Sequence, residues 1–228
     1  MSASDSPRSA LVVGSTGLVG GFLVRRLVDD ARYGAVHAPT RRDLPFEHPE
    51  LHPHAVDFDR LGDADDAIFA VDDVFCTLGT TIKKAGSREA FRRVDQHYVE
   101  AVARRARAAG ARRFTMVSSV GADARSSNFY LGVKGAAEDA VDACAYPELH
   151  ILRPSLLLGD RPEHRLGERA ATVASKLVSP LLLGPVARYR PIHARTVAAG
   201  MVGAASGGRG GKHVYTYRGI RRVAGGSS

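Results

Sequence analysis

Residues 10–20 read ALVVGSTGLVG, an apolar run that passes into three glycines spaced three residues apart. Apolar runs of this kind are typical of parallel strands that are buried on both faces. Glycines directly after such a strand permit a tight turn and let backbone N–H groups approach a pyrophosphate at the start of the next helix. The stretch therefore predicts the first strand, turn and helix of a dinucleotide-binding sheet. The expected cofactor-binding residues of this turn are Gly14, Ser15, Thr16, Gly17, Leu18, Val19 and Gly20.

The GxxGxxG spacing differs from the more familiar GxGxxG, and it has a purely structural alternative, in which the glycines only help the helix to pack on the sheet. The rest of the chain supports the first interpretation, because apolar runs and helical patterns alternate along it. The expected strands are 10–16, 35–41, 54–58, 72–79, 112–120 and 149–159, and the expected helices are 18–28, 63–70, 87–110 and one that carries Tyr130. Such alternation predicts an α/β fold, a doubly wound parallel sheet of the Rossmann type.

Chain length and the positions of Pro and Gly indicate the domain organisation. A chain of 228 residues suits a single domain, here residues 1–228. From about residue 160 the alternation gives way to segments broken by Pro and Gly, so we expect a small C-terminal lobe for a substrate or partner. In the 87–110 segment, Ser87 is the expected N-cap and Gly110 the expected end of a long helix.

Composition excludes several classes of partner. The net charge is +8, yet the basic residues are spread over the whole chain without aromatic interleaving, so no nucleic-acid binding is expected. No run approaches the 18 or so apolar residues that a membrane helix needs, and the first ten residues lack a signal-peptide core. Cys76 and Cys144 lie far apart without metal-ligand spacing. We therefore expect reduced cysteines, no membrane association and a cytoplasmic protein, as a monomer or homodimer.

The ends of the later strands suggest how the cofactor is chosen. Pro39-Thr40-Arg41-Arg42 ends the second strand with two guanidinium groups and no acidic residue. Arginine forks suit a 2′-phosphate, which a carboxylate would repel, so Arg41 and Arg42 predict NADP(H) rather than NAD(H). The alternative is two surface arginines in an Arg-rich chain. Further cofactor contacts are expected from the ends of the third and fourth strands, with Asp57 and Phe58 at the adenine and Leu78, Gly79 and Thr80 along the ribose and nicotinamide.

A tyrosine and a lysine stand one helical turn apart in residues 127–142, SNFYLGVKGAAEDAVD. Tyr130 and Lys134 share one face of a helix at this spacing, although YxxxK also arises by chance. Together with the serines that end the fifth strand, they resemble the Ser–Tyr–Lys set of the short-chain dehydrogenase/reductase superfamily. The match is to the atypical branch that includes the Tat-interacting oxidoreductase-like proteins and their bacterial relatives. The segments that carry it are GSTGLVG, VDF, CTLGTT, FRRVDQHYV, SSVGAD, SSNFYLGVKG, LRPSLLLGDRPEHRLGE and PIHARTVA.

The resemblance implies roles for these residues. Tyr130 would be the acid/base that exchanges a proton with a substrate hydroxyl or carbonyl during hydride transfer. A free tyrosine titrates near pKa 10, and the Lys134 ammonium would favour the phenolate form. Lys134 would also bind the nicotinamide ribose. Ser119 would hold the substrate oxygen, with Ser118 as the alternative. Arg165 would contact cofactor or substrate, or else lie in a surface loop.

Three departures from the family pattern leave the activity open. Asp95 occupies the position where many members have an Asn in a proton relay, the Ser119–Tyr130 interval is short, and the segment after residue 159 is small. The leading expectation is an oxidoreductase acting on a small carbonyl or alcohol; the alternative is a redox-sensing NADP(H)-binding protein with little turnover. A nucleotide-sugar epimerase would need a larger lobe. A metal site at His48, His52 and His54 is not expected, because the nearby prolines predict an extended connector.

Overall fold

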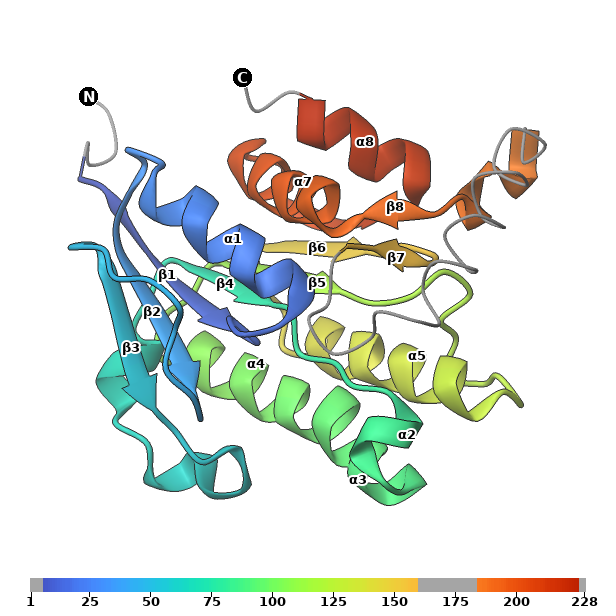
Figure 1. Cartoon of the computed structure of the whole chain (residues 1–228), viewed down its shortest axis with the longest axis horizontal. Helices are drawn as coiled ribbons and strands as arrows, with labels where there is room; N and C mark the ends of the chain where they lie inside the picture. The colour runs from blue at the N-terminus through green and yellow to red at the C-terminus, as the bar shows by residue number, and fades with distance from the viewer. Residues whose placement is uncertain (1–5, 160–183, 226–228) are drawn as a thin grey trace.

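A seven-stranded parallel sheet forms the centre of the molecule, for which a computed structural model describes residues 6–159 and 184–225 (Figure 1). The strands lie in the order β3-β2-β1-β4-β5-β6-β9, and each neighbouring pair is parallel. The order changes direction between β1 and β4, where open α/β sheets bind ligands at the carboxyl ends of their strands. The strands are β1 Arg8–Val13, β2 Tyr33–Thr40, β3 Leu51–Ala55, β4 Asp73–Cys76, β5 Arg113–Val117, β6 Glu148–Leu152 and β9 Gly211–Tyr215.

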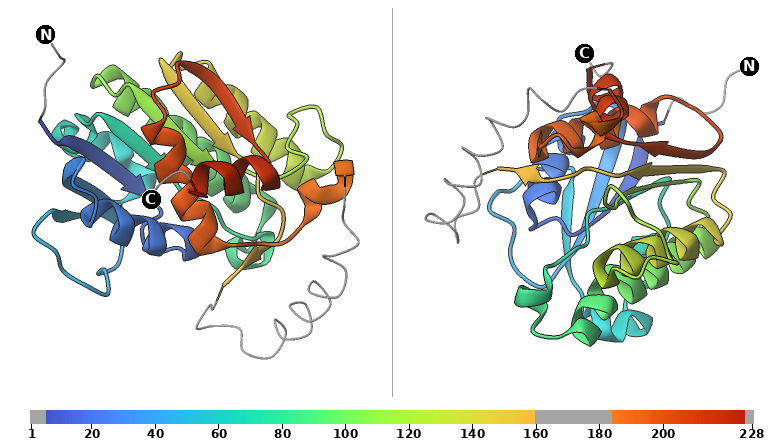
Figure 2. Two further views of the ribbon diagram at one scale, coloured as in Figure 1. Left: turned by 90° about the horizontal axis from the view of Figure 1, so that it is seen from above. Right: turned by 90° about the vertical axis from the view of Figure 1, so that its right-hand side faces the viewer.

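Helices cover both faces of this sheet (Figures 1 and 2). One layer holds α1 (Leu18–Val28), α7 (Ala194–Ser206) and α8 (Tyr217–Gly225), and the other holds α4 (Tyr98–Ala108) and α5 (Phe129–Asp142). The central strand β1 supplies both cores, because its successive side chains point to opposite faces. Ala10 and Val12 pack toward α1 and α7, whereas Leu11 and Val13 pack toward α4 and α5. The predicted doubly wound Rossmann sheet is confirmed.

The third strand lies three residues earlier than the sequence suggested. The prediction was 54–58, with a His- and Pro-rich loop before it; the strand is Leu51–Ala55, so His52, Pro53 and His54 belong to it. Proline is tolerated here because β3 is an edge strand, with one side free of ladder hydrogen bonds. The segment expected as a helix over 63–70 instead forms two short 3₁₀ turns, η1 (Phe58–Asp63) and η2 (Asp66–Phe69).

The long helix expected over 87–110 is real but interrupted. It begins with α3 (Arg88–Arg92), passes through a π-helical turn, η3 (Arg93–His97), and continues as α4. Ser87 is its N-cap as predicted, since the Ser87 hydroxyl accepts a 3.0 Å bond from the Ala90 N–H. π-Turns are rare and are found mostly at functional sites, because the extra residue turns a side chain to a new direction. Here that turn carries Asp95.

The described chain after residue 183 returns to the main sheet. It runs through η5 (Gly184–Tyr189) and β8 (Ile192–His193), forms α7 beside α1, and then adds β9 next to β6. A small second sheet pairs β8 with β7 (Leu157–Leu158). The sequence did not predict β9 or α7 as parts of the central architecture. The expected lobe begins at about residue 160, and residues 160–183 lie outside the described part of the chain.

Candidate functional site

The turn after β1 is closed by contact between backbones. Gly14 has φ +84°, and a Cβ at that position would lie 2.7–2.8 Å from three atoms of Thr77 at the end of β4. A Cβ on Gly20, in the first turns of α1, would lie 2.1 Å from the Gly14 carbonyl oxygen. Any side chain at either position would force the turn apart. These two glycines therefore bring the start of α1 against the carboxyl ends of β1 and β4.

The start of α1 suits an anionic group. Gly17 is its N-cap and has no side chain that could cap the N–H groups of the first turn. Within the described residues the hydroxyl of Ser15 is buried without a hydrogen-bond partner. A buried unpaired hydroxyl is costly, and the N-terminus of a helix attracts negative charge. Both features fit the pyrophosphate of a dinucleotide, which can accept hydrogen bonds from this turn.

A cleft of about 430 Å³ opens at the same edge of the sheet. It is bordered by the glycine turn, the end of β2, the start of η1, the loop after β4 and one face of the helix that contains η3. Its lining residues are Gly14, Ser15, Thr16, Pro39, Thr40, Arg41, Arg42, Phe58, Leu78, Lys84, Val94 and Tyr98. The cleft thus joins segments that are far apart in sequence, as expected for the ligand crevice of a doubly wound sheet.

The end of β2 presents the two arginines to this cleft. The Thr40 hydroxyl accepts a 3.1 Å bond from the Arg42 N–H and donates a 2.7 Å bond to the Arg42 carbonyl oxygen. This closed pair of bonds fixes the backbone on which Arg41 and Arg42 stand. Both side chains are exposed at the rim, where they can reach a phosphate.

Aromatic side chains form another part of the cleft wall. The rings of Phe58 and Tyr98 lie 5.6 Å apart between their centroids. The Tyr98 hydroxyl donates a 2.6 Å bond to Asp59, and burial together with this carboxylate raises the pKa of Tyr98 to about 12. Tyr98 lines the cleft one turn after Val94, on the same face of the helix.

A buried ion pair lies beyond Leu78. The Lys134 ammonium on α5 is 2.6 Å from Asp95 Oδ1, and the side chains are 8% and 0% exposed. The Thr80 N–H donates a 2.9 Å bond to Asp95 Oδ2. Burial on its own lowers the pKa of Lys134, but the charge and hydrogen bond of Asp95, together with the nearby Tyr130 and Cys76, outweigh burial, so the pKa of Lys134 is raised. The ammonium is therefore held charged.

Gly79 is packed directly over this pair. A Cβ at Gly79 would lie 3.4 Å from Asp95 Oδ1 and 3.5 Å from the Lys134 ammonium nitrogen. The loop after β4 thus rests on the ion pair, with Leu78 in the cleft and Gly79 in contact with Lys134. Leu78 and Gly79 thus connect the cleft to the ion pair of Lys134 and Asp95.

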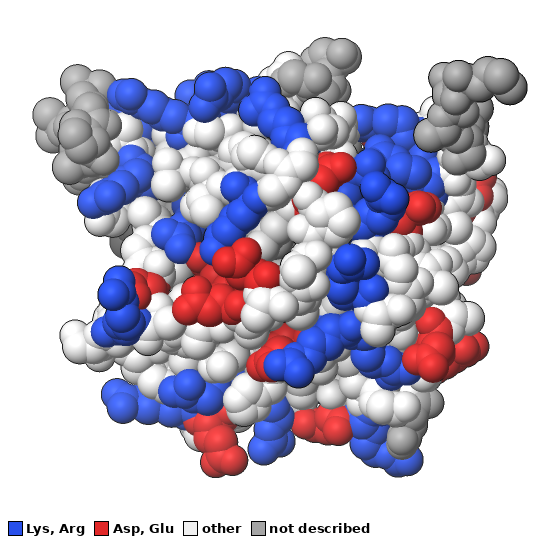
Figure 3. Space-filling view, turned by 180° about the vertical axis from the view of Figure 1, so that it is seen from behind, with Lys and Arg blue, Asp and Glu red and all other residues white. Residues whose placement is uncertain are grey.

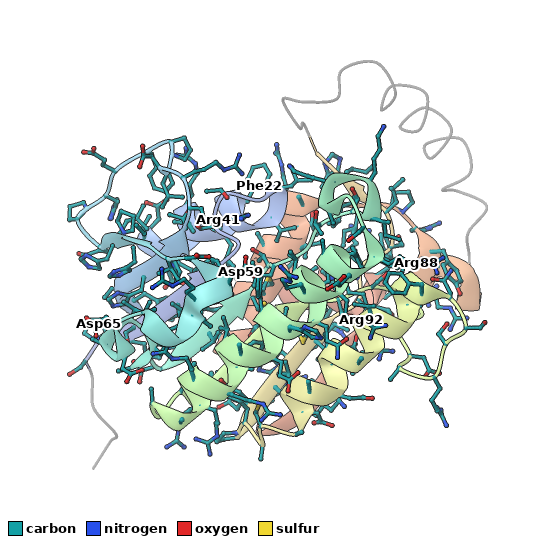
Figure 4. All side chains as sticks on the ribbon, turned by 90° about the horizontal axis from the view of Figure 1, so that it is seen from below. Phe22, Arg41, Asp59, Asp65, Arg88 and Arg92 are labelled. Carbon is teal, nitrogen blue, oxygen red and sulfur yellow. The ribbon has the colours of Figure 1, made fainter. Side chains whose placement is uncertain are left out.

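Tyr130 stands one turn before Lys134, in the first turn of α5. Asn128 caps this helix by accepting a 3.2 Å bond from the Leu131 N–H. The half-buried Tyr130 ring lies 5.6 Å from the ring of Phe91 on α3. Arg88 and Arg92 of α3 stand over the neighbouring ring of Phe129, and Figure 4 shows both arginines beside the start of α5.

The two candidate serines follow β5. Ser119 is half-buried, and its hydroxyl makes a long 3.4 Å contact to the Val120 carbonyl oxygen. The Ser118 hydroxyl is buried and has no hydrogen-bond partner among the described residues. The choice between Ser118 and Ser119 as the residue that holds a substrate oxygen stays a prediction.

The structure places the remaining predicted residues as follows. Val19 is buried in the core, so only its backbone can serve a cofactor. Asp57 accepts a 3.0 Å bond from the Asp59 N–H and is not among the residues that line the cleft. Arg165 lies outside the described residues. Sequence reasoning missed five lining residues of the cleft, which are Pro39, Thr40, Lys84, Val94 and Tyr98.

The histidines of β2 and β3 pack against one another. His52 and His54 face His37 of β2, and His37 Nδ1 lies 2.9 Å from His54 Nε2. Within the residues that the structure describes, no group of three or more His, Cys, Asp or Glu side chains is arranged to hold a metal ion. Cys76 and Cys144 are both free thiols. None of the helices in the described ranges is long and apolar enough to cross a membrane.

The chain is similar to known proteins over much of its length. Residues 14–179 match a family model described as NAD(P)H-binding. Protein HTATIP2 from Rattus norvegicus is 38% identical over 164 residues, which cover 71% of this chain and 67% of that protein. The protein named FMP52-1, mitochondrial, from Scheffersomyces stipitis is 35% identical over 162 residues, with coverages of 67% and 69%. The solved structure of MoeE5 in complex with UDP-glucose and NAD has a TM-score of 0.67 at 20% identity and covers 92% of this chain and 75% of that one.

Proposed function

The chain belongs to the NAD(P)H-binding family and has the Rossmann fold of the short-chain dehydrogenases, and from this premise we propose that it is an NADP(H)-dependent oxidoreductase. Its proposed reaction is the reduction of a small carbonyl compound or the oxidation of the corresponding alcohol. One observation carries the proposal: Leu78 lines the cleft while the next residue, Gly79, lies against Lys134, one turn from Tyr130. A dinucleotide that follows this loop from the glycine turn would present its nicotinamide end to the Tyr–Lys pair.

Different residues of the chain would bind different parts of the dinucleotide. The turn at Gly14 and the buried Ser15 hydroxyl would hold the pyrophosphate, and Phe58 and Tyr98 would flank the adenine. In the described residues Lys134 has only Asp95 as a charged partner. Since an ammonium has three donors, two remain for the hydroxyls of the nicotinamide ribose.

The proposed preference for NADP(H) rests on the rim of the cleft. Arg41 and Arg42 stand on a backbone fixed by Thr40, and neither makes an ion pair with a carboxylate among the described residues. Guanidinium groups at this position favour a 2′-phosphate, because they bind two of its oxygens at once.

Tyr130 and Lys134 do not line the cleft itself but lie beyond Leu78, and the chemistry proposed there is a proton transfer by this chain. A bound NADPH would supply the hydride that reduces the carbonyl carbon, and it would leave as NADP⁺. Tyr130 gives its phenolic proton to the carbonyl oxygen, so that the C=O double bond becomes a C–H and an O–H bond. Ser119, or Ser118, holds that oxygen by a hydrogen bond, and solvent returns a proton to Tyr130. Positioned acid/base groups of this kind typically contribute about 10²–10⁴-fold to a rate.

The proposal also includes the class of substrate and the cellular compartment. Figure 3 shows Lys and Arg interspersed with Asp and Glu on the face seen from behind, which fits a small-molecule substrate better than nucleic acid. The two free cysteines fit a reducing compartment, for which we propose the cytoplasm.

Incubation of the purified protein with NADPH and a panel of aldehydes, ketones and quinones tests the proposal. We expect NADPH oxidation that depends on at least one member of the panel. NADPH binding without any oxidation across the panel would contradict the proposal and support a regulatory NADP(H)-binding protein instead. Absence of NADPH binding would contradict both functions.

A further inference from the structure

The net charge of the chain lies entirely in its C-terminal segment. Lys and Arg are spread along the whole sequence, but Asp and Glu are not: residues 184–228 contain eight Lys and Arg and no acidic residue. Because the chain has 32 Lys and Arg and 24 Asp and Glu in all, residues 1–183 contain 24 of each and are neutral overall. Residues 160–183 have four basic and three acidic residues, so no surplus of acid precedes the segment. The last elements of the fold therefore carry the whole excess charge.

Tyr217 brings arginines from two of these elements together. Arg190, which follows η5, and Arg221 of α8 have their guanidinium carbons 6.0 and 5.8 Å from the centre of the Tyr217 ring. Arg188 of η5 lies 5.0 Å from the centre of the Tyr189 ring, and Tyr189 is 45% exposed. Contact with an aromatic face orients a guanidinium group. The end of η5 and the start of α8 therefore present arginines and tyrosines side by side.

Tyr215 links β9 to the same group of cations. Burial raises the pKa of the Tyr215 phenol, and the charges of Arg209 and Arg222 both oppose that shift, so the two guanidinium groups lie near one hydroxyl. α8 itself lies on the outside of α7 (Figures 1 and 2). The arginines around the tyrosines, with one more on α8, form a cationic face: Arg188, Arg190, Arg209, Arg218, Arg221 and Arg222.

The charges of this cationic face are not balanced within the molecule. Among the described residues no carboxylate forms an ion pair with any of its arginines. Arg218 and Arg222 lie one turn apart on α8, and like charges at this spacing destabilise a helix. On α4, by contrast, Arg104 has Glu100 at 2.7 Å at the same spacing. The helix dipole favours Arg222 in the last turn but opposes Arg218 in the first, so the stability of α8 does not explain the set.

The packing of α8 indicates which kind of partner fits. Ile220 is fully buried, and a Cβ on Gly200 of α7 would lie 2.9 Å from Ile220 Cγ2, so the apolar side of α8 is packed against α7. A helix that binds a membrane surface instead buries its apolar side in the bilayer. Planar guanidinium groups bind both oxygens of a carboxylate, and Arg and Tyr are enriched where proteins meet. An acidic protein therefore fits this surface better than a membrane does.

We infer that the cationic face binds an acidic protein, through a surface or segment rich in Asp and Glu. The arginines around Tyr215 and Tyr217 take the carboxylates, and the exposed Tyr189 ring adds contact area beside them. The contact needs neither a nucleotide nor Tyr130, so it is independent of the proposed oxidoreductase reaction. Its affinity falls as the salt concentration rises, because the charges on both sides are exposed.

Two pairs of substitutions separate this surface from net charge. Arg218→Gln with Arg222→Gln removes two charges from α8 and keeps long polar side chains. Arg88→Gln with Arg92→Gln on α3 is the matched control, because these arginines are also exposed, one turn apart and without a carboxylate partner among the described residues. Both proteins should be as resistant to urea as the unmodified protein, since neither loses an ion pair. A loss of stability in the α8 pair alone would show that its arginines serve the fold, and would overturn the inference.

The binding probe is a fluorescent poly-L-glutamate peptide, followed by anisotropy at low and at physiological salt. We expect saturable binding by the unmodified protein that weakens as salt is added. The α8 pair should bind at least about fivefold more weakly, and the α3 pair should bind like the unmodified protein. No binding at low salt would overturn the inference, and so would an equal loss in both pairs, which would mean that only net charge matters.

Duplex DNA and vesicles of phosphatidylserine with phosphatidylcholine test the other anionic partners. The same two pairs of substitutions are measured against each of them at low salt. We expect the loss caused by the α8 pair to be largest with poly-L-glutamate. A larger loss with DNA or with the vesicles would assign the cationic face to a nucleic acid or to a membrane, and would overturn the inference.

Discussion

Gly20 of α1 faces the carbonyl oxygen of Gly14 so closely that a Cβ on Gly20 would lie 2.1 Å from that oxygen. This contact sets the distance between the phosphate turn and the helix that follows it. The neighbouring Gly21 lies in the same helix, but a Cβ there would lie 3.8 Å from the nearest atom, the Ser15 carbonyl oxygen. The two glycines therefore form a matched pair, in which only Gly20 is required for the close approach.

Gly20→Ala should destabilise the protein by roughly 2–4 kcal/mol and lower its affinity for NADPH at least about tenfold, because the turn must open. Gly21→Ala should be neutral or stabilise by about 0.5–1 kcal/mol, since alanine favours a helix. Urea unfolding and calorimetric titration with NADPH measure both effects. Equal behaviour of the two variants would show that the close approach is not required.

Arg41→Ala should remove most of the preference for NADPH. The lost contact with a charged phosphate is worth about 1.5–3 kcal/mol, or roughly a 10- to 100-fold loss of NADPH affinity with NADH affinity unchanged. Arg26→Ala, on the exposed face of α1, is the control for a lost surface arginine. If the unmodified protein binds NADPH and NADH equally well, the assignment of Arg41 and Arg42 is wrong.

Lys134→Met should cost about 3–5 kcal/mol in the free energy of unfolding, because it leaves the buried Asp95 without its charged partner. Combining it with Asp95→Asn should recover much of that loss, since the buried charge is then also removed. Neither protein should retain turnover, because both lack the ammonium. The check is a double-mutant cycle by urea unfolding, with assays in parallel. A cycle without coupling would mean that the 2.6 Å contact contributes nothing to stability.

The stability of the protein should fall as the pH drops from about 6.5 to about 4. His150 is fully buried between β5 and β9, and burial lowers its pKa to about 4 from an ordinary value of 6.5. In this interval His150 therefore takes up a proton in the unfolded chain but not in the folded chain. The contribution of neutral His150 to the free energy of unfolding is complete above about pH 6.5 and is lost toward pH 4. The expected contribution is roughly 3 kcal/mol, at about 1.4 kcal/mol per pH unit.

His150→Phe keeps a ring beside His213 and Tyr215 but cannot take up a proton. Its free energy of unfolding should depend less steeply on pH across the same interval. Urea unfolding at several pH values measures how steeply the free energy of unfolding depends on pH. The same slope in both proteins would assign the acid sensitivity to other groups.

The sequence was sufficient for the doubly wound class of the fold and for most residues that line the cleft. The apolar run at 10–13 and the glycines after it predicted β1, its turn and α1, because these features depend only on local periodicity and on missing side chains. Arg41, Phe58 and Leu78 were placed in the cleft from one rule, that parallel strands end at the same edge. The early strands and helices therefore specify the nucleotide crevice almost by themselves.

The errors have physical reasons that lie outside local patterns. The predicted bounds of β3 were wrong because Pro53 and the nearby histidines are typical of an extended loop, whereas an edge strand tolerates them. β9 has mostly exposed side chains and no strong apolar alternation, so its pairing with β6 was not visible in the sequence. The direction of Asp95 depends on a π-turn, which has no sequence signature of its own.

The central claim is that Tyr130 supplies the proton for a reaction at the Lys134 end of an NADP(H) cleft. Tyr130→Phe tests it most directly, because the ring stays against Phe91 while the transferable proton is removed. With the carbonyl substrate found in the panel, we expect turnover to fall by about 10²-fold or more, and the NADPH dissociation constant to stay unchanged. Turnover by Tyr130→Phe at the rate of the unmodified protein would contradict the claim.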